Sequence, residues 1–473
     1  MTRTYIPPTD SMFLLADTPE TKMHVAGLMQ FIPPKSAGPN YLRDLLADLE
    51  SAPIEPPWNL KLATPWFVRN PFQAWVTDED FDIHYHVRRS ALASPGDERE
   101  LGMLISRLHS NALDFNRPPW EMHLIEGLEG GRFAMYVKIH HSLVDGVSGV
   151  KLLQRSLSTS ARERNKPMFF SVPLRKPRTA IEPAPSSSAM PQLVRSAASV
   201  ATSVIGSTTS VAKAIYNLQF NSDAQHSELV KGLSAPRSVL NQRTGRNRRF
   251  ATQHYDMARL QALAKASGGT VNDVVIAVFG GGLRAYLNEL DALPKTSLIG
   301  FLPVNIRAED DAGGGNKVGA TLAPLGTDIA DPVERLEEII ASTRQAKGQM
   351  AGLSQGAILA YSGYLLAPAA LQTIGAMAGI GRLMPSTFNV CISNLPGPDK
   401  PLYFRGARLE SYYPVSIAAH GMALNITCLS YAGSMNVGFI GCRDALPSLQ
   451  RLAVHTGLAL AELEKGYGLE PPR

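Results

Sequence analysis

The chain has 473 residues, too many for one ordinary hydrophobic core, so we expect two domains. It is 44% hydrophobic and 18% charged, which is typical of a folded protein, and it contains no uninterrupted apolar stretch typical of a membrane-spanning helix. Met1 to Asp10 lacks the apolar segment of a secretory signal, and the three cysteines lack metal or disulfide spacing. These features exclude a disulfide-stabilised secreted protein and predict a location in the reducing cytosol.

The N-terminal part alternates between helix and strand patterns. We expect a short helix after Thr9, a strand over 23–31, a helix over 41–49, a strand over 81–87 and an amphipathic helix through Leu101 to Leu108. In the strand over 81–87, His84 and His86 would share one face.

The most informative stretch runs from Phe133 to Gly146. Its apolar residues up to Ile139 predict a strand, which forms a hairpin with 120–125 around Gly127 to Gly131. His140 and His141 end this strand, and because strand side chains alternate, we expect them to point to opposite faces. Taken alone, the pattern also fits a buried histidine pair that only satisfies core hydrogen bonds.

A change of composition after residue 157 predicts a linker. Residues 158–192 are rich in Pro, Ser and Arg, and 161–178 holds six basic residues against Glu163 alone. Such a segment suits an anionic lipid surface, while a solvated linker explains it equally well. Nucleic acid is disfavoured as a partner because no binding motif accompanies the charge. Residues 193–218 regain a helical pattern of small residues.

The second half predicts another α/β domain. We expect strands over 248–255, 298–307 and 389–394, helices over 258–266, 270–290, 332–347 and 449–463, and a charge-free run from Gly348 to Gly381. Thr270 and Asp273 have the spacing of a capping box. Gly280, Gly281 and Gly282 inside the helix over 270–290 predict a close approach, and we expect a substrate acyl chain there. The domains are therefore 1–157 and 241–473, joined by a linker over 158–240.

Three motifs carry a resemblance that covers nearly the whole chain. They are His140-His141-Ser-Leu-Val-Asp145-Gly146, Val271-Asn272-Asp273-Val274 and residues 389–397, which include Asn394. The first is similar to the His-His-x-x-x-Asp-Gly motif of CoA-dependent acyltransferases, and the whole chain resembles the bacterial wax ester synthase/diacylglycerol acyltransferase family. Where that family usually has Pro-Leu-Trp-Glu, this chain has Pro118-Pro119-Trp120-Glu121, so we expect Trp120 to position the hairpin rather than to act in chemistry.

The resemblance implies a fold and a set of residue roles. The fold is α/β, with two chloramphenicol-acetyltransferase-like domains, mixed sheets flanked by helices, and an active-site channel between them. His141 is expected to be the general base, and Asp145, next to Gly146, to pair with an arginine. Arg307 is our candidate for that arginine, with Arg89 and Arg117 as alternatives.

Three further assignments come from the residues themselves, and two of them have alternatives. We expect His140 to brace the strand as a core histidine. Asn272 either caps its helix or donates a hydrogen bond to the oxyanion of the reaction. A basic cluster, Arg243 to Arg249, either meets the phosphates of CoA or is a solvated strand entrance.

The expected activity is acyl-CoA-dependent O-acyl transfer, which makes wax esters from long-chain alcohols, triacylglycerol from diacylglycerol, or both. Transfer from the thioester is expected to be direct, because no Gly-x-Ser-x-Gly elbow surrounds Ser142. No metal or cofactor is expected besides the substrate acyl-CoA. We expect a cytoplasmic enzyme, peripherally bound to the inner membrane or lipid inclusions through 161–178 and 348–381. The alternatives are a condensation-domain-like acyltransferase with a carrier-bound donor and a catalytically silent scaffold on lipid droplets.

Overall fold

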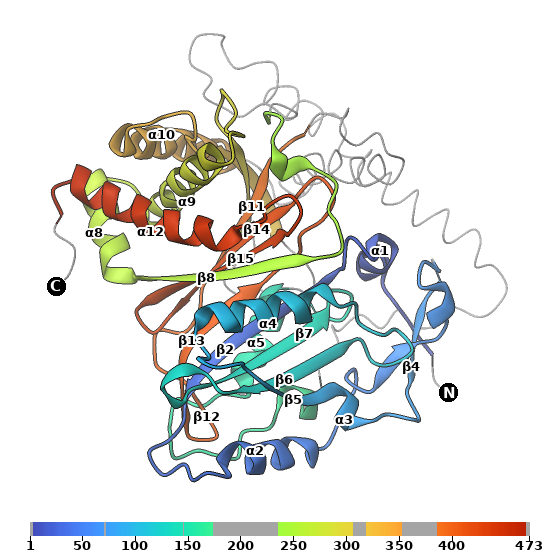
Figure 1. Ribbon diagram of the computed structural model, residues 1–473. Helices are drawn as coiled ribbons and strands as arrows, with labels where there is room; N and C mark the ends of the chain where they lie inside the picture. The colour runs from blue at the N-terminus through green and yellow to red at the C-terminus, as the bar shows by residue number, and fades with distance from the viewer. Residues whose placement is uncertain are drawn as a thin grey trace.

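The computed structural model describes residues 3–70, 72–144, 146–173, 235–305, 318–351 and 386–469. These residues form two six-stranded sheets flanked by helices and one small three-stranded sheet (Figure 1). The expected α/β fold, with mixed sheets flanked by helices, is therefore confirmed. Asp145, Arg307, the predicted helix over 193–218 and most of the charge-free run after Gly348 lie outside the described residues.

The first sheet carries the two histidines. Its strands are β2 (His24–Ile32), β5 (Val87–Ala91), β6 (Trp120–Glu126), β7 (Phe133–His140), β12 (Tyr403–Phe404) and β13 (Ala407–Val415), in the order β12-β13-β2-β7-β6-β5. β6 and β7 form the predicted antiparallel hairpin, and β2 pairs with β7 on its other side. Helix α4 (Glu98–Ser110) packs on one face of this sheet and α5 (Gly146–Arg155) on the other.

The strand predicted over 81–87 is wrong. Residues Ile83–His86 form a single helical turn, α3, because the Asp82 side chain accepts a hydrogen bond from the backbone N–H of His84. The strand begins only at Val87. His84 is therefore exposed, whereas His86 is buried between the rings of Phe81 and Trp120.

The second sheet and its helices form the other half of the molecule. Its strands are β8 (Arg248–Asp256), β9 (Ile299–Asn305), β10 (Val318–Pro324), β11 (Val390–Leu395), β14 (Leu424–Tyr431) and β15 (Ser434–Cys442), in the order β10-β9-β11-β14-β15-β8. Its helices are α8 (Met257–Ser267), α9 (Val271–Glu289), α10 (Pro332–Ala351) and α12 (Leu449–Gly466), which gather on one side of this sheet (Figure 1). In the described part of the chain, no single helix could cross a membrane by length and apolarity, and only α8 and α9 pass together, bent by 101°.

The predicted capping box at the start of α9 is confirmed. The Thr270 hydroxyl accepts from the backbone N–H of Asp273, and the Asp273 carboxylate accepts from the backbone N–H of Thr270 at 2.8 Å. The other carboxylate oxygen of Asp273 accepts a 2.7 Å hydrogen bond from the Thr343 hydroxyl on α10. Asp273 is therefore a buried structural residue that fixes α9 against α10.

The prediction that an acyl chain approaches Gly280, Gly281 and Gly282 is wrong. A methyl group on Gly280 would lie 1.9 Å from the carbonyl oxygen of Leu325, and one on Gly282 would lie 2.4 Å from a side-chain atom of Thr456. All three glycines are buried, and the close approach that they permit is that of Leu325, which follows β10, and of α10 and α12 onto α9. Helix packing explains them without a ligand.

The second half of the chain contributes two strands to the first sheet. β12 and β13 follow β11 in sequence, yet they complete the first sheet, where β13 pairs antiparallel with β2 from Ala26 to Ile32. β13 also crosses the second sheet closely, since a methyl group on Gly438 of β15 would lie 1.9 Å from the carbonyl oxygen of Pro414. The first sheet is consequently completed by chain from the second half.

A second seam joins α4 to the edge strand β8. The hydroxyls of Ser106 and Ser110 accept hydrogen bonds from the backbone N–H groups of Phe250 and Arg248, at 2.9 and 2.8 Å. Gly102, one turn earlier, lets the helix approach the carbonyl of Phe250. An edge strand otherwise leaves such groups without partners, so these serines take the place of a neighbouring strand.

The N-terminus forms a small unit beside the first sheet. Its elements are β1 (Thr4–Tyr5), β3 (Leu60–Leu62) and β4 (Ala74–Thr77), in the order β1-β4-β3, with helix α1 (Pro8–Ala16) and the 3-10 turn η1 (Pro65–Phe67). The remaining short elements are α2 (Tyr41–Glu50), η2 (Glu129–Gly131), η3 (Phe169–Ser171) and η4 (Val239–Asn241). α1 confirms the helix expected near Thr9, although no side chain caps it.

The seam between α4 and β8 can be tested by substitution. Ser106→Ala leaves the buried N–H of Phe250 without its acceptor, so we expect the free energy of unfolding to fall by about 1–3 kcal/mol in a denaturant titration. The control is Ser51→Ala, whose hydroxyl makes an exposed hydrogen bond to the carbonyl of Asp48 and should change stability by less than about 0.5 kcal/mol. Equal effects in the two variants would contradict the role given to the seam.

His86 makes stability depend on pH. Burial lowers the pKa of its imidazole from 6.5 to about 4, so below pH 6.5 the unfolded chain binds a proton that the folded chain does not. As the pH is lowered from 6.5 towards 4, this residue alone should therefore reduce the free energy of unfolding by about 1.4 kcal/mol per pH unit. His86→Gln should remove that share of the slope in denaturant titrations from pH 7 to pH 4.5. Ser51→Ala is the control, because it removes no titratable group, and should leave the slope unchanged.

Candidate active site

The site begins where β7 ends. His140 is the last residue of β7, opposite His24 of β2, and the next backbone N–H, that of His141, donates to the carbonyl of Met23 at 2.8 Å. A 3.0 Å hydrogen bond from the N–H of Leu143 to the carbonyl of His140 then turns the chain. Backbone pairing thus extends past the strand and fixes the position of His141.

His140 is held on both sides of its ring. Its Nδ1 lies 2.7 Å from the Ser142 hydroxyl and accepts from the Ser142 backbone N–H at 3.2 Å, so the ring proton belongs on Nε2. Nε2 faces the Asp17 carboxylate at 3.5 Å, and Phe115 packs edge-on against the ring. The imidazole is buried and acts as a brace between the strand and the end of α1.

His141 has different surroundings. Its ring is partly exposed and stacks on Phe13 of α1, with ring centroids 4.0 Å apart and an angle of 23° between the planes. Leu143, two residues further on, packs against the small core of Ile6, Leu14 and Trp75. The N-terminal unit therefore covers one side of the His141 imidazole.

A buried polar network supports this end of the sheet from behind. The Lys138 ammonium donates to the carbonyls of Leu108 and Asn111 at 2.9 and 3.0 Å, and the ring of His24 bonds to the carbonyl of His109 at 3.0 Å. The last carbonyls of a helix have no partner within the helix, and a cation suits that end of its dipole. The C-terminal end of α4 is thereby tied to β7 and β2 beside the histidine pair.

The network is completed by Glu121, which lies 2.6 Å from the Lys138 ammonium. Burial alone would raise the pKa of the Glu121 carboxyl, but His123 and Lys138 lower the pKa to about 2. Burial lowers the pKa of Lys138, and Glu121 opposes that shift. Burial also lowers the pKa values of His24 and His109 well below their usual range, so both are neutral at physiological pH. Nothing in the sequence pattern distinguished these residues, because their partners are distant in the chain.

An apolar cavity of about 60 Å³ lies between the two halves, beside β7. Val137 and Ile139 line it from β7, on the alternate positions that lead to His141. Its other walls come from β2, α5, β13, β11 and β14, including Gly27, Gly149, Tyr412, Leu395 and Thr427. Gly27 makes room for the cavity wall, since a methyl group there would lie 2.8 Å from the ring of Tyr412. Chain from both halves is therefore needed to enclose it.

The remaining predicted residues lie elsewhere. Asn272 is in the first turn of α9, where the side chain of Thr270 caps the helix, so Asn272 is not the capping residue. Asn394 is exposed on β11, while its neighbour Leu395 reaches the cavity. Trp120 is buried and donates its indole N–H to the carbonyl of Trp58 at 2.8 Å, in keeping with a positioning role for this segment.

Arg89 and Arg117, the alternative partners of Asp145, have other neighbours. Arg89 makes a 2.6 Å ion pair with Glu126, and Arg117 stacks over the ring of Tyr85. In the cluster Arg243 to Arg249, the buried guanidinium of Arg248 donates to the carbonyls of Glu20 and Ala418. Arg248 thus joins the two halves of the chain instead of facing a phosphate.

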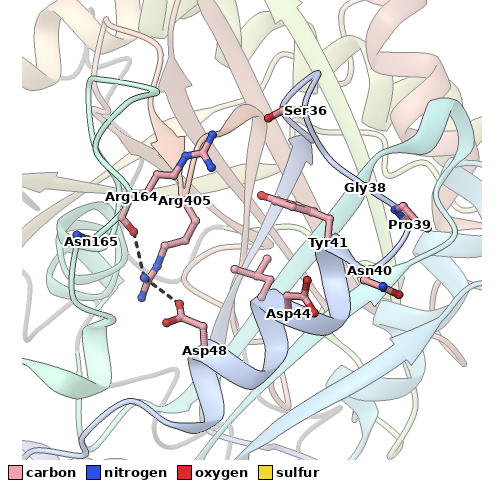
Figure 2. Close-up of a pocket in the computed structure, with 11 residues that line it drawn as sticks. Ser36, Gly38, Pro39, Asn40, Tyr41, Asp44, Asp48, Arg164, Asn165 and Arg405 are labelled. Carbon is pink, nitrogen blue, oxygen red and sulfur yellow. Dashed lines mark hydrogen bonds and ion pairs between the residues drawn. The ribbon is translucent and has the colours of Figure 1, made fainter.

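A larger, polar cavity of about 550 Å³ is separate from this site (Figure 2). Arg405 crosses it to reach Asp48 at 2.8 Å and the backbone carbonyl of Arg164 at 3.0 Å. Ser36 and Gly38 line it just beyond the end of β2, whereas His141 lies beside the beginning of β2. A nine-residue strand at about 3.3 Å per residue separates the two positions by roughly 26 Å or more, so this cavity is not the site of His141.

Comparison with known proteins identifies the class. Residues 6–275 match the wax ester synthase/diacylglycerol acyltransferase catalytic domain, and residues 314–464 match the C-terminal domain of the same family. The chain is 49% identical to a putative diacylglycerol O-acyltransferase of Mycobacterium tuberculosis, over 98% of this chain and 97% of that protein. It is 39% identical to the O-acyltransferase WSD of Acinetobacter baylyi, over 95% of this chain and 94% of that protein.

Solved structures agree with the sequence comparisons. The wax ester synthase/diacylglycerol acyltransferase of Marinobacter aquaeolei VT8 matches with a TM-score of 0.78 and 37% identity, over 98% of this chain and 100% of that chain. The first condensation domain of a calcium-dependent antibiotic synthetase has a TM-score of 0.54 at 16% identity, which shows a shared fold alone. The protein is therefore an acyltransferase. It belongs to the wax ester synthase/diacylglycerol acyltransferase family.

Proposed function

We propose that this enzyme transfers an acyl group from acyl-CoA to the hydroxyl of a long-chain alcohol or a diacylglycerol, with His141 as the general base. The main support for this proposal is the contrast between the surroundings of the two histidines. Ser142 and Asp17 hold the two ring nitrogens of His140, whereas His141 is partly exposed and follows the strand whose Val137 and Ile139 line the apolar cavity. The names of the relatives, which include both activities, support the choice of acceptors.

The proposed step is direct transfer. The His141 imidazole takes the proton of the acceptor hydroxyl, and its oxygen attacks the thioester carbonyl. The tetrahedral intermediate collapses by breaking the carbon–sulfur bond, and the departing thiolate takes the proton back from the imidazolium. The reaction uses no resident cofactor or metal, since the imidazole moves the proton and the acyl carrier is a substrate.

An acyl-enzyme on Ser142 is the competing mechanism. Ser142, His140 and Asp17 lie in the order of a serine, histidine and aspartate triad. The Ser142 side chain is buried, however, and its own backbone N–H donates to the same Nδ1 atom that would have to accept the hydroxyl proton. This geometry favours a structural role for the three residues.

At about 60 Å³, the apolar cavity has room for a few methylene groups of one of the two hydrocarbon chains. Its lining carries few polar atoms, which favours the transfer of methylene groups out of water. A carrier-bound acyl donor, as in condensation domains, is the alternative, but the likeness to those domains extends to the fold alone. We further propose that the enzyme works in the cytoplasm, peripherally bound to the inner membrane or to lipid inclusions, where such acceptors reside.

The general-base assignment can be tested with purified protein, palmitoyl-CoA and a panel of alcohols and diacylglycerol. His141→Ala should lower the release of CoA thiol about 10²–10⁴-fold, since positioned proton transfer contributes about that much. His140→Gln should retain measurable turnover but lower the melting temperature, because it removes a buried brace. Ser142→Ala should remain active with no acyl adduct by mass spectrometry. Equal loss in folded His140 and His141 variants, or a trapped adduct on Ser142, would refute the proposal.

The role of the cavity has its own test. A methyl group on Gly149 would lie 3.4 Å from Val144, an ordinary contact, so Gly149→Leu can fill the cavity from α5 without a backbone clash. We expect kcat/KM for palmitoyl-CoA to fall about tenfold or more, and that for a short acyl-CoA to fall less. Gly38→Leu fills the polar cavity of Figure 2 in the same way and should change neither value. An equal fall in kcat/KM for long and short acyl-CoA would contradict the proposal that the cavity holds the acyl chain.

A further inference from the structure

Six large apolar side chains of the N-terminal unit are exposed to solvent. They are Tyr5, Met12, Leu15, Trp66, Phe67 and Phe72, which we call the aromatic platform. Trp66 is 82% exposed, although the three other tryptophans of the chain, Trp58, Trp75 and Trp120, are all buried. Single exposed apolar residues are ordinary, but six in one small unit are typical of an interaction site.

The platform residues belong to one packed unit. Tyr5 of β1 pairs with Ala74 of β4, and the core beneath them joins Leu14 of α1 to Leu62 and Trp75 of the small sheet. α1 therefore lies on the same unit as the strands, and Figure 1 shows α1 and β4 together on one side of the molecule. The fold brings together side chains from three separate segments of sequence.

The loop that presents three of the four rings, those of Trp66, Phe67 and Phe72, is held by side-chain hydrogen bonds. Gln73 is buried, and its amide bonds to Thr64 and to the carbonyl of Phe67. The Asn70 side chain donates to the Thr64 hydroxyl and accepts from the backbone N–H of Phe72. Buried polar side chains thus fix a loop whose aromatic rings point into solvent. Such order lowers the entropy lost when the rings bind a partner.

The charges around the platform are mixed. Arg3 and Arg69 are exposed and residues 59–77 contain no Asp or Glu, but Asp10 lies on α1 and Asp78, Glu79 and Asp80 follow β4. The residue types favour a lipid surface instead. Tryptophan, tyrosine and arginine sit at the boundary between lipid headgroups and hydrocarbon, and Trp66, Tyr5 and Arg69 present all three types to solvent.

The platform is also next to the catalytic residue. Phe13 stacks on His141, and its helix neighbours Met12 and Leu15 belong to the platform. We propose that the aromatic platform docks on a phospholipid surface and so holds the His141 site against the lipid that contains the acyl acceptor. The docking step stands on the surface itself, and only the delivery of the acceptor rests on the proposed function.

The fluorescence of Trp66 reports docking directly. On addition of mixed phosphatidylglycerol and phosphatidylcholine vesicles, we expect a blue shift of tryptophan emission and quenching by brominated acyl chains. Trp66→Phe should keep vesicle binding but lose both signals, because the other tryptophans are buried. Vesicle binding with no change in Trp66 emission would overturn the proposal.

A pair of triple variants tests the surface. Trp66→Ala/Phe67→Ala/Phe72→Ala should weaken co-sedimentation with these vesicles at least tenfold, with an unchanged melting temperature. The matched control is Met103→Ala/Val454→Ala/Leu458→Ala, which removes exposed apolar side chains from α4 and α12 and should leave binding unchanged. Turnover of vesicle-embedded diacylglycerol should fall with binding, while turnover of a short soluble alcohol should survive. Loss of binding in the control variant to the same extent would overturn the assignment of the surface.

Two further outcomes distinguish this inference from its rivals. If the platform variant binds vesicles normally but converts a dimer to a monomer in light scattering, the platform is a protein interface and the inference is wrong. It is also wrong if only replacement of the six basic residues of 161–178 by Gln abolishes vesicle binding. If platform-dependent binding is found but no acceptor is esterified, the docking surface stands and the proposed function fails.

Discussion

The hydrogen bonds along α4 are the constraint on which the rest of the structure depends. Its serines take the place of a neighbouring strand for β8, at the edge of the second sheet. Its final carbonyls accept from Lys138 and His24, at the end of the first sheet that carries His141. One helix therefore fixes both the contact between the halves and the position of the catalytic strand. Because these groups are buried, breaking any of them leaves a polar atom without water or partner.

Because β12 and β13 come from the second half but belong to the first sheet, the cavity is a property of the whole chain. β13 pairs with β2 in the first sheet, and its end forms part of the cavity wall together with β11 and β14 of the second. The close approach at Gly438 holds that wall in place. Neither half could enclose the cavity alone, so the two halves should unfold cooperatively and the site should be lost with either of them.

Local signals predicted much of the fold. The hairpin before His141 and the capping box of Thr270 and Asp273 were visible because their partners lie within a few residues. The family was visible because its motifs are contiguous. The hydrogen bonds of Ser106 and Lys138 could not be predicted, since their partners are distant in the chain and are backbone groups that every residue carries. The prediction of an acyl chain at Gly280 failed for the same reason, because a glycine indicates that some group approaches closely but does not identify that group. The helix at 83–86 depended on one aspartate side chain that competes with strand propensity.

The aromatic platform was hidden from sequence in the same way. Its residues are scattered between Tyr5 and Phe72 and show no amphipathic period, so the pattern directed attention to the continuous segments 161–178 and 348–381. The two kinds of signal describe different physical steps. Charge in a linker acts over about a Debye length and attracts without orienting. Aromatic rings on a rigid unit act at contact and define one orientation. Only the second can place His141 against the lipid, because it is fixed to the same helix that covers the imidazole.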